Sequence, residues 1–558
     1  MLGTTRALRD VRVERLAPYE RRRPEESVLY GVVQQELETF VARAQARERP
    51  VPRFVERELR AFLDCGILAH GFVRVHCDGC GHDRLVAFSC KGRGFCPSCG
   101  GRRMADTAAH LVDRVLPEVP IRQWVLTLPY PLRYRCAYDA RLTGAVLRAF
   151  IRTVFGELRR RARRHWGLRA EQCGAVTFIQ RFGSALNLNL HFHTLALDGA
   201  YPYAVGQGQA PRFLSVPPPD SDDVARVLAG TARRVRRLIE ARAGDEDDAL
   251  ARDEPLLALL ADASLRSRIA SGPQRGLPWR RLGDRVEPRA AEGAEPDPES
   301  SARVPQHGGM SLHADVAVPA RDRRRLERLC RYVARPALAH ERLEERTDGT
   351  LVLRLKTRWR DGTTHILMER SELLERLVPL VPPPRAHQVR YHGILAPGAS
   401  LRDRVAPGAA IPRPAGRGTT ALDPGASDRA SAMGREPVQT SRQPNASASS
   451  GAAIETARID TEAKPSTEAH LPSADARGRS RRLRWASLLQ RVFEIEALRC
   501  LRCGSTMRLI GAIEDPVVAR KILACLGLPA RAPPLAVQIE DHAVESWDFD
   551  QTPIDDEP

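Results

Sequence analysis

Two cysteine pairs near the N-terminus restrict the fold of this chain more than any other feature. Cys77-x-x-Cys80 is followed, after fifteen intervening residues, by Cys96-x-x-Cys99. The segment from Cys77 to Gly101 is rich in Gly and short of large apolar residues, which is typical of a small domain whose core is replaced by a metal. This spacing lets two tight turns present four thiolates to one tetrahedral zinc ion. We therefore predict a structural Zn²⁺ site formed by Cys77, Cys80, Cys96 and Cys99.

The zinc module has two interpretations. In the first, the adjacent Arg93, Arg102 and Arg103 contact DNA. In the second, the metal only stabilises its own neighbourhood. Both can hold, and the sequence does not decide between them.

Other cysteines have no complete ligand pattern. Cys65 and Cys90 are interpreted as ordinary cysteines, although either could substitute for one zinc ligand. Cys500-x-x-Cys503 is followed by no second pair, so half of a zinc site and a plain turn fit it equally well.

Polar and apolar residues alternate strictly from Leu186 to Thr194. This period of two predicts a strand with its leucines and Phe192 on one face, and its asparagines, His191 and His193 on the other. Two imidazoles spaced i, i+2 stand side by side, close enough to share a divalent ion. The alternative is a polar face on the protein surface.

Residues 323–336 form a basic amphipathic segment that predicts a helix, which Pro336 limits. Tyr332 lies near the buried edge of that helix, where a phenolate could form a covalent bond to a DNA phosphate. The apolar positions expected to face a core are Leu326, Leu329 and Val333. The arginines expected to hold the flanking phosphates are Arg328, Arg331 and Arg335. The alternative for Tyr332 is an ordinary amphipathic position.

The charge balance favours a polyanionic partner. The formal net charge is +18 and the pI is about 9.9, and of 87 Lys and Arg residues only four are Lys. Arginine binds phosphate bidentately, which suits nucleic acid, although GC-rich codons also favour arginine. Residues 1–10 have no apolar core of a secretory signal, and no apolar run approaches a membrane span, so we expect an intracellular, cytoplasmic protein.

The organisation along the chain predicts an α+β protein. Residues 1–105 are expected to form a helical and zinc-binding domain, and residues 106–395, which alternate strand-like and helical segments, a catalytic domain. Residues 396–480 are rich in Ala, Pro, Gly and Ser and predict a disordered linker. Residues 481–558 would form a small C-terminal module. No Walker loop or dinucleotide fingerprint is present, so an ATP-driven mechanism has no support.

Several motifs together resemble one known family. They are Cys90 to Cys99, Val125 to Pro129, His191 to His193, Ser311 to Ala314, Arg331 to Pro336 and Arg390 to Gly393. They resemble the HUH-type transposases of rolling-circle insertion sequences, in the group numbered ninety-one, which carry an N-terminal zinc-binding domain. The resemblance covers most of residues 60 to 395.

This resemblance implies a five-stranded antiparallel sheet of the HUH endonuclease type, with the histidines on a central strand and the tyrosine on a nearby helix. Tyr332 would attack the single-stranded DNA ends of a mobile element, leaving a 5′-phosphotyrosine link and a free 3′-hydroxyl. His191 and His193 would bind Mg²⁺ or Mn²⁺, and His313 is the expected third ligand. Some members carry a second tyrosine four residues after the first. Here Pro336 stands at that position, which suggests a single-tyrosine variant.

Three alternatives stay open. A non-catalytic zinc-containing DNA-binding regulator would bind DNA without cleaving it. A related HUH protein of replication or plasmid strand transfer would share the chemistry but act on another origin. An RNA-processing role ranks last, because no RNA-recognition motif with paired aromatic residues appears. The sequence does not indicate the target DNA or the oligomeric state.

Overall fold

The structure is a computed structural model. It describes residues 21–167, 171–202, 211–242, 248–283, 305–359, 361–407, 486–487, 490–491 and 496–536. These residues belong to one compact unit, which joins the chain up to Ile411 with the chain from Arg481 onward. The predicted linker, residues 396–480, lies outside the described residues from 408 onward.

The N-terminal part begins with two helices, as the apolar periodicity of this region indicates. The elements here are η1 (Pro24–Glu26), α1 (Val28–Ala46), α2 (Arg53–Asp64), η2 (Leu68–His70), β1 (Phe72–His76), β2 (Asp83–Ala87) and α3 (Pro97–Arg114). Ser27 caps α1 by accepting a hydrogen bond from the Tyr30 amide. The predicted domain boundary at residue 105 falls inside α3, which continues to Arg114.

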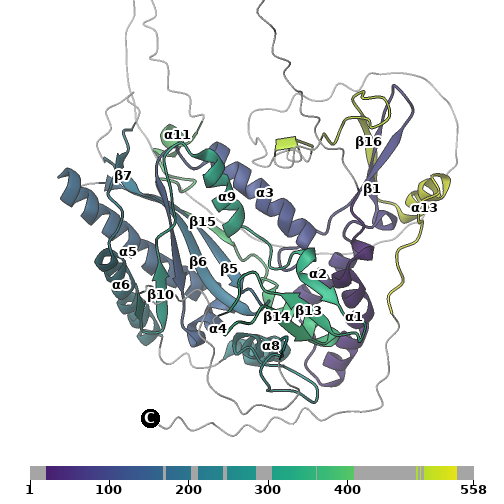
Figure 1. Ribbon diagram of the computed structural model, residues 1–558, viewed down its shortest axis with the longest axis horizontal. Helices are drawn as coiled ribbons and strands as arrows, with labels where there is room; N and C mark the ends of the chain where they lie inside the picture. Colours follow the sequence, from purple (N-terminus) through teal and green to yellow (C-terminus); the bar gives the residue numbers. More distant parts are fainter. Residues whose placement is uncertain are drawn as a thin grey trace, which may run out of the picture. The chain divides into compact units, whose positions relative to one another are not determined.

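A seven-stranded antiparallel sheet forms the centre of the molecule (Figure 1). Its order is β15 (Val389–Gly393), β5 (Gly174–Phe182), β6 (Leu188–Leu197), β3 (Ile121–Thr127), β10 (Met310–His313) and β9 (Gln306–His307), and β11 (Ala317–Val318) also pairs with β3. The strand predicted from residue 186 begins two residues later. Leu186 has a φ of 61° and lies in the turn between β5 and β6, because the chain must reverse there.

Helices cover both faces of this sheet (Figure 1). Leu188, Leu190 and Phe192 of β6 pack with α5 (Ala140–Trp166) and α6 (Ser221–Glu240). Leu195 and Leu197 pack on the opposite side with α3 and α9 (Arg323–Val333). The alternation along β6 therefore assigns each face of the sheet to its own pair of helices.

The remaining elements surround this framework. They are α4 (Tyr130–Tyr138), β4 (Glu171–Gln172), β7 (Gly199–Pro202), β8 (Leu214–Ser215), α7 (Ala249–Asp253), α8 (Pro255–Leu265), η3 (His340–Arg342), β12 (Leu343–Glu345), β13 (Leu351–Arg354), β14 (His365–Met368), α10 (Arg370–Leu377), η4 (Val378–Leu380) and α11 (Arg402–Val405). β12, β13 and β14 form one small sheet, and β4, β7 and β8 form another. The mixed α+β architecture predicted from the sequence is confirmed. None of the described helices is long and apolar enough to cross a bilayer.

The described part of the C-terminal segment, residues 481–558, joins the N-terminal part. β16 (Arg508–Ile513) pairs antiparallel with β1, giving a three-stranded sheet in the order β16-β1-β2. α13 (Pro516–Cys525) packs beside it, where Ala519 and Leu523 share a core with Leu68 and Phe72. This segment thus shares a sheet and a core with residues near position 70.

Candidate functional site

The histidine pair lies on β6 and is buried. His191 is 3 % exposed and His193 is 2 % exposed, so the strand face that carries them is not a surface face. Their ring centroids lie 4.8 Å apart. The i, i+2 spacing therefore places two imidazoles side by side inside the protein, as the alternating pattern predicts.

Each imidazole is held through its Nδ1 atom. Nδ1 of His191 lies 2.8 Å from the backbone oxygen of Asn189, which can only accept, so this nitrogen carries the proton and Nε2 carries the lone pair. Nδ1 of His193 lies 2.7 Å from Nε2 of the Gln123 side-chain amide on the neighbouring strand β3. An amide nitrogen donates, so with this orientation of the amide Nδ1 accepts the hydrogen bond. When that amide presents its oxygen, Nε2 of His193 likewise becomes a free electron-pair donor.

Three buried polar atoms without a partner in the described part of the chain lie on this face of the sheet. Nε2 of His193, Oε1 of Gln180 and Oδ1 of Asn189 have no hydrogen-bond partner among the described residues. Gln180 lies directly opposite His191 across the β5–β6 pair. A buried polar group without a partner costs about 1–3 kcal/mol. A cation bound by these oxygen and nitrogen atoms would remove that cost, so the atoms suit a cation site.

The charge state of His193 agrees with such a role. Burial, followed by the charges of His191, Arg335 and Lys356, holds the pKa of His193 well below its usual value. The neutral imidazole is the form that binds metals.

Tyr332 lies on α9 and faces the histidines. Its ring centroid is 6.3 Å from that of His193, with the two rings perpendicular. The side chain is 38 % exposed. Leu326, Leu329 and Val333 are buried in the core beneath α9, as the amphipathic pattern predicts. This packing fixes the helix against the sheet face that carries the histidines.

Two cations lie against the Tyr332 ring. Nζ of Lys356 is 3.7 Å from the ring centroid, and the Arg335 guanidinium carbon is 4.7 Å from it. Nη1 of Arg335 is buried and has no hydrogen-bond partner among the described residues. A phenol, two imidazoles and two cations thus meet in one place, which is a chemistry suited to a phosphate group.

His313 lies on the same face of the sheet as His193, separated from it by one strand. It lies on β10, in register with Val125 of β3, which is in turn in register with His193. Its Nε2 atom lies 3.2 Å from a carboxylate oxygen of Asp315. Among the described residues, the groups of three or more His, Cys, Asp or Glu ligand atoms within 4.8 Å of one another are two cysteine clusters, and His313 is in neither.

The six arginines predicted to contact DNA divide into two groups. Arg93 donates to the backbone oxygens of Ala386 and Pro383, and Arg103 donates to those of Lys91 and Gly92. These hydrogen bonds hold neighbouring loops in place. The other group lies on the outside or near Tyr332. Arg102 and Arg328 are exposed, Arg331 pairs with Glu327 at 2.7 Å, and Arg335 stacks on Tyr332.

The four cysteines predicted to share one zinc ion divide between two clusters. Cys96 and Cys99 gather with Cys65 and Cys90, whereas Cys77 and Cys80 gather with Cys500 and Cys503. The prediction of a single site from Cys77, Cys80, Cys96 and Cys99 is therefore corrected to two groups of four. The reason is geometric, because β1 and β2 carry the first pair away from the start of α3.

The first cluster is formed around the start of α3. Cys65 ends α2, Cys96 caps α3, and Cys99 lies in its first turn. The Sγ atoms of Cys65 and Cys90 lie 3.7 and 3.4 Å from that of Cys99. The helix N-terminus favours thiolates, and four of them suit Zn²⁺. Cys65 and Cys90, interpreted from the sequence as ordinary cysteines because neither belongs to a C-x-x-C pair, complete this cluster.

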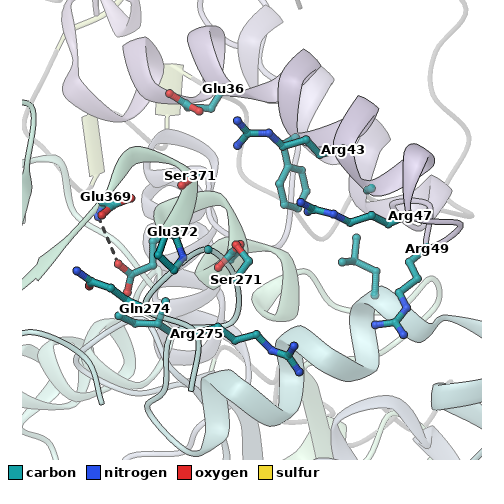
Figure 2. Close-up of a pocket in the computed structure, with 17 residues that line it drawn as sticks. Glu36, Arg43, Arg47, Arg49, Ser271, Gln274, Arg275, Glu369, Ser371 and Glu372 are labelled. Carbon is teal, nitrogen blue, oxygen red and sulfur yellow. Dashed lines mark hydrogen bonds between the residues drawn. The ribbon is translucent and has the colours of Figure 1, made fainter. Parts of the chain in front are cut away.

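A cavity lies elsewhere in the described part of the chain. It has a volume of about 860 Å³ and lies between the end of α1 and the region of α10 (Figure 2). Arg43, Arg47 and Arg49 line one side, and glutamates including Glu369 and Glu372 line the other. Neither His191 nor Tyr332 lines it, and its mixed charge indicates no single ligand class.

Two regions of the chain match protein-family models. Residues 32–128 match a family model described as "Transposase zinc-binding domain", of insertion-sequence group ninety-one. Residues 174–403 match a family model described as "Putative transposase". Searches of curated proteins and of solved structures found no match. The two family matches confirm the resemblance indicated by the sequence motifs.

Proposed function

We propose that this chain, whose zinc-binding and central regions match those of transposases, cleaves and rejoins single-stranded DNA through Tyr332 and a divalent ion. The observation that carries the proposal is the 6.3 Å separation of the Tyr332 and His193 rings. This separation supports the proposal because the proposed nucleophile and the proposed metal ligands, on separate elements, lie on one face of the sheet. The substrate would be the ends of a mobile element, moved by a rolling-circle route in the bacterial cytoplasm.

The residues of the site fit a divalent cation. Nε2 of His191 and Nε2 of His193 would be its nitrogen ligands. We assign the third ligand to Oε1 of Gln180 in place of His313, because this oxygen is buried, has no partner among the described residues and lies opposite His191. Two imidazoles, an amide oxygen and water are a set that Mg²⁺ or Mn²⁺ accepts. When bound, the ion would polarise the phosphate and favour departure of the 3′-oxygen.

The protein's own residues would carry out the exchange. The Tyr332 oxygen attacks the phosphorus and its proton passes to water. The bond between phosphorus and the 3′-oxygen breaks, and the departing 3′-oxygen takes up a proton from water. The products are a 5′-phosphotyrosine link and a 3′-hydroxyl, so the phosphodiester is conserved for rejoining. Arg335 and Lys356 would hold the non-bridging phosphate oxygens while negative charge develops there.

A single tyrosine would serve each cleavage. α9 ends at Val333, and Pro336 stands where a second tyrosine four residues later would be. Rejoining would then require the free 3′-hydroxyl of another strand to attack the phosphotyrosine.

The zinc-binding domain would support this centre. The thiolates of Cys65, Cys90, Cys96 and Cys99 would hold a structural Zn²⁺ at the start of α3. α3 packs directly on α9, the helix of Tyr332. Exposed Arg102 and Arg328, one on each of these helices, would contact DNA phosphates.

The proposal is tested by trapping the covalent intermediate. Wild type and the Tyr332→Phe variant are incubated with end-labelled single-stranded DNA from the element ends, with Mn²⁺ or with a chelator, and separated under denaturing conditions. Tyr391→Phe is the matched control, because Tyr391 lies on β15 and, like Tyr332, has an arginine against its ring. We expect a metal-dependent adduct from wild type and the control, and none from Tyr332→Phe. DNA binding without any adduct would instead support a non-catalytic regulator.

A further inference from the structure

The second cysteine cluster joins the two ends of the described chain. Sγ of Cys77 lies 3.4 Å from Sγ of Cys503, and Sγ of Cys80 lies 3.4 Å from Sγ of Cys500. All four sulfur atoms lie within 4.8 Å of one another. The paired cysteines are separated by 426 and 420 residues in the sequence.

The two halves of this cluster have the same local conformation. In each half the sequence is Cys-x-x-Cys-Gly, and the glycine, Gly81 or Gly504, has a positive φ of 69° or 75°. The glycine amide donates to the oxygen of the first cysteine at 2.9 Å in both halves. The amides of Cys77 and Cys500 donate to the residue after the glycine, at 2.9 and 2.8 Å. Both halves therefore have the knuckle conformation typical of zinc ligands, including the C-terminal one that has no second pair after it.

The surrounding structure holds the two knuckles together. β16 pairs with β1 from Phe72↔Ile513 to His76↔Arg508. Arg84 donates to the backbone oxygens of Ala497 and Arg499 at 2.7 and 3.0 Å. Val75, Cys77, Cys500 and Met507 share a small buried core. These contacts bring the four thiols together before any metal is considered.

We propose that Cys77, Cys80, Cys500 and Cys503 bind a second zinc ion, which closes a zinc ribbon assembled from two distant parts of the chain. Four thiols in contact suit a soft tetrahedral cation, and four thiolates select zinc over oxygen-preferring ions such as Mg²⁺. The site is distinct from the Cys65 cluster. Cys500 and Cys503 also lie outside both regions that match transposase families.

This second zinc ion would act as a clasp for the C-terminal segment. Arg491, just before the C-terminal knuckle, contacts Asp113 of α3 at 2.8 Å and Glu327 of α9 at 3.0 Å. Glu327 stands on the same helix as Tyr332. Zinc at the clasp would therefore keep in place a segment that bridges the zinc-binding region and the tyrosine helix.

The zinc content of the purified protein tests the site. We expect two zinc ions per chain in wild type and one in the Cys500→Ser, Cys503→Ser double variant. Cys525→Ser is the matched control, because Cys525 is exposed on α13 and belongs to neither cluster, and it should keep two. One zinc ion in wild type, or two in the double variant, would overturn the proposal.

A second measurement leaves the cysteines intact. A protease site is introduced near residue 440 and cleaved in the folded protein, and the two fragments are followed by size-exclusion chromatography. We expect the C-terminal fragment to stay bound while zinc is present and to separate after chelation. Separation with zinc still bound would overturn the clasp. Neither measurement depends on DNA cleavage. The proposed function and the second zinc site can therefore each fail without affecting the other.

Discussion

The side-chain amide of Gln123 lies 2.7 Å from Nδ1 of His193, across the pair formed by β3 and β6. Within the described ranges, no backbone carbonyl holds this imidazole as Asn189 holds His191. The orientation of one proposed ligand therefore depends on a neighbouring strand, and on which end of an amide faces it. Residues that orient a metal-bound histidine commonly change metal affinity by about 10–100-fold when they are replaced.

Gln123→Leu should therefore weaken binding of Mn²⁺ by roughly 10–100-fold. The apolar side chain fills the space but offers Nδ1 of His193 no hydrogen-bond partner, so the ring loses the contact that orients it. Gln123→Glu should keep most of the affinity, because a carboxylate accepts a proton from Nδ1 and so leaves the lone pair on Nε2. Calorimetric titration of Mn²⁺ into each variant measures this. Equal affinities for the leucine and glutamate variants would show that Gln123 does not orient the ligand.

Lys356→Ala should slow formation of the covalent adduct by about tenfold or more. The loss should stay below the ~10²–10³-fold typical of a buried oxyanion donor, because Lys356 is exposed. Lys356→Arg should recover part of the rate, since it keeps the charge beside the Tyr332 ring. Lys521→Ala serves as control, as Lys521 is an exposed lysine on α13. Single-turnover adduct formation gives the rates, and an unchanged rate for Lys356→Ala would exclude Lys356 from the reaction.

Gly100→Ala should destabilise the protein, whereas Gly101→Ala should not. A Cβ atom at Gly100 would stand 2.6 Å from Cβ of Pro336, so α3 and the chain after α9 would have to separate. At Gly101 nothing lies within 4 Å, and alanine in a helix is more favourable than glycine by up to about 1 kcal/mol. Urea unfolding curves should therefore show a lower midpoint for Gly100→Ala and an unchanged or higher one for Gly101→Ala. Equal midpoints would contradict the close approach.

Glu375→Gln should flatten the dependence of stability on pH. Burial raises the pKa of the Glu375 carboxyl from 4.5 to about 7, with Glu372 raising it further and Ser271 and Arg376 lowering it. Between these two values the folded protein holds a proton that the unfolded chain releases. The contribution of Glu375 is therefore fully present below pH 4.5 and is lost as the pH rises through 7.

Thermal unfolding between pH 5 and 8 measures this effect. The Tm of wild type should fall over that range relative to the Tm of Glu375→Gln, and the exposed Glu344→Gln variant should follow wild type. If the wild-type and Glu375→Gln profiles run parallel, Glu375 is ionised in the folded protein throughout.

The alternation of Leu188, Leu190 and Phe192 with His191 and His193 predicted a strand and its two faces from the sequence. A shift of one residue along a strand would move every core side chain to the opposite face of the sheet. The apolar pattern is therefore compatible with one register only. The same pattern could not indicate burial of the histidines. Their face is covered by α3 and α9, which lie on either side of the strand in the sequence.

The spacing of the cysteines in the sequence does not predict which of them share one metal site. C-x-x-C fixes a knuckle, but not the second knuckle that completes the site, because that choice depends on the path of the chain between them. Cys77 lies beside the cysteines near residue 500 because β1 pairs with β16. Gln123 and Lys356 belong to no sequence motif. The register of the sheet brings Gln123 to His193, and the fold of the loop after β13 brings Lys356 to Tyr332.

The pairing of β1 with β16 has a consequence for biosynthesis. Phe72 leaves the ribosome long before Ile513, and the knuckle partners are 426 residues apart. At about 5–20 residues per second, the interval is roughly 20–90 s. Throughout that time one edge of β1 is an open row of unpaired backbone groups, which invites aggregation. A nascent chain that stops before residue 508 would keep both histidines and Tyr332, yet leave this edge open for chaperones and proteases to recognise.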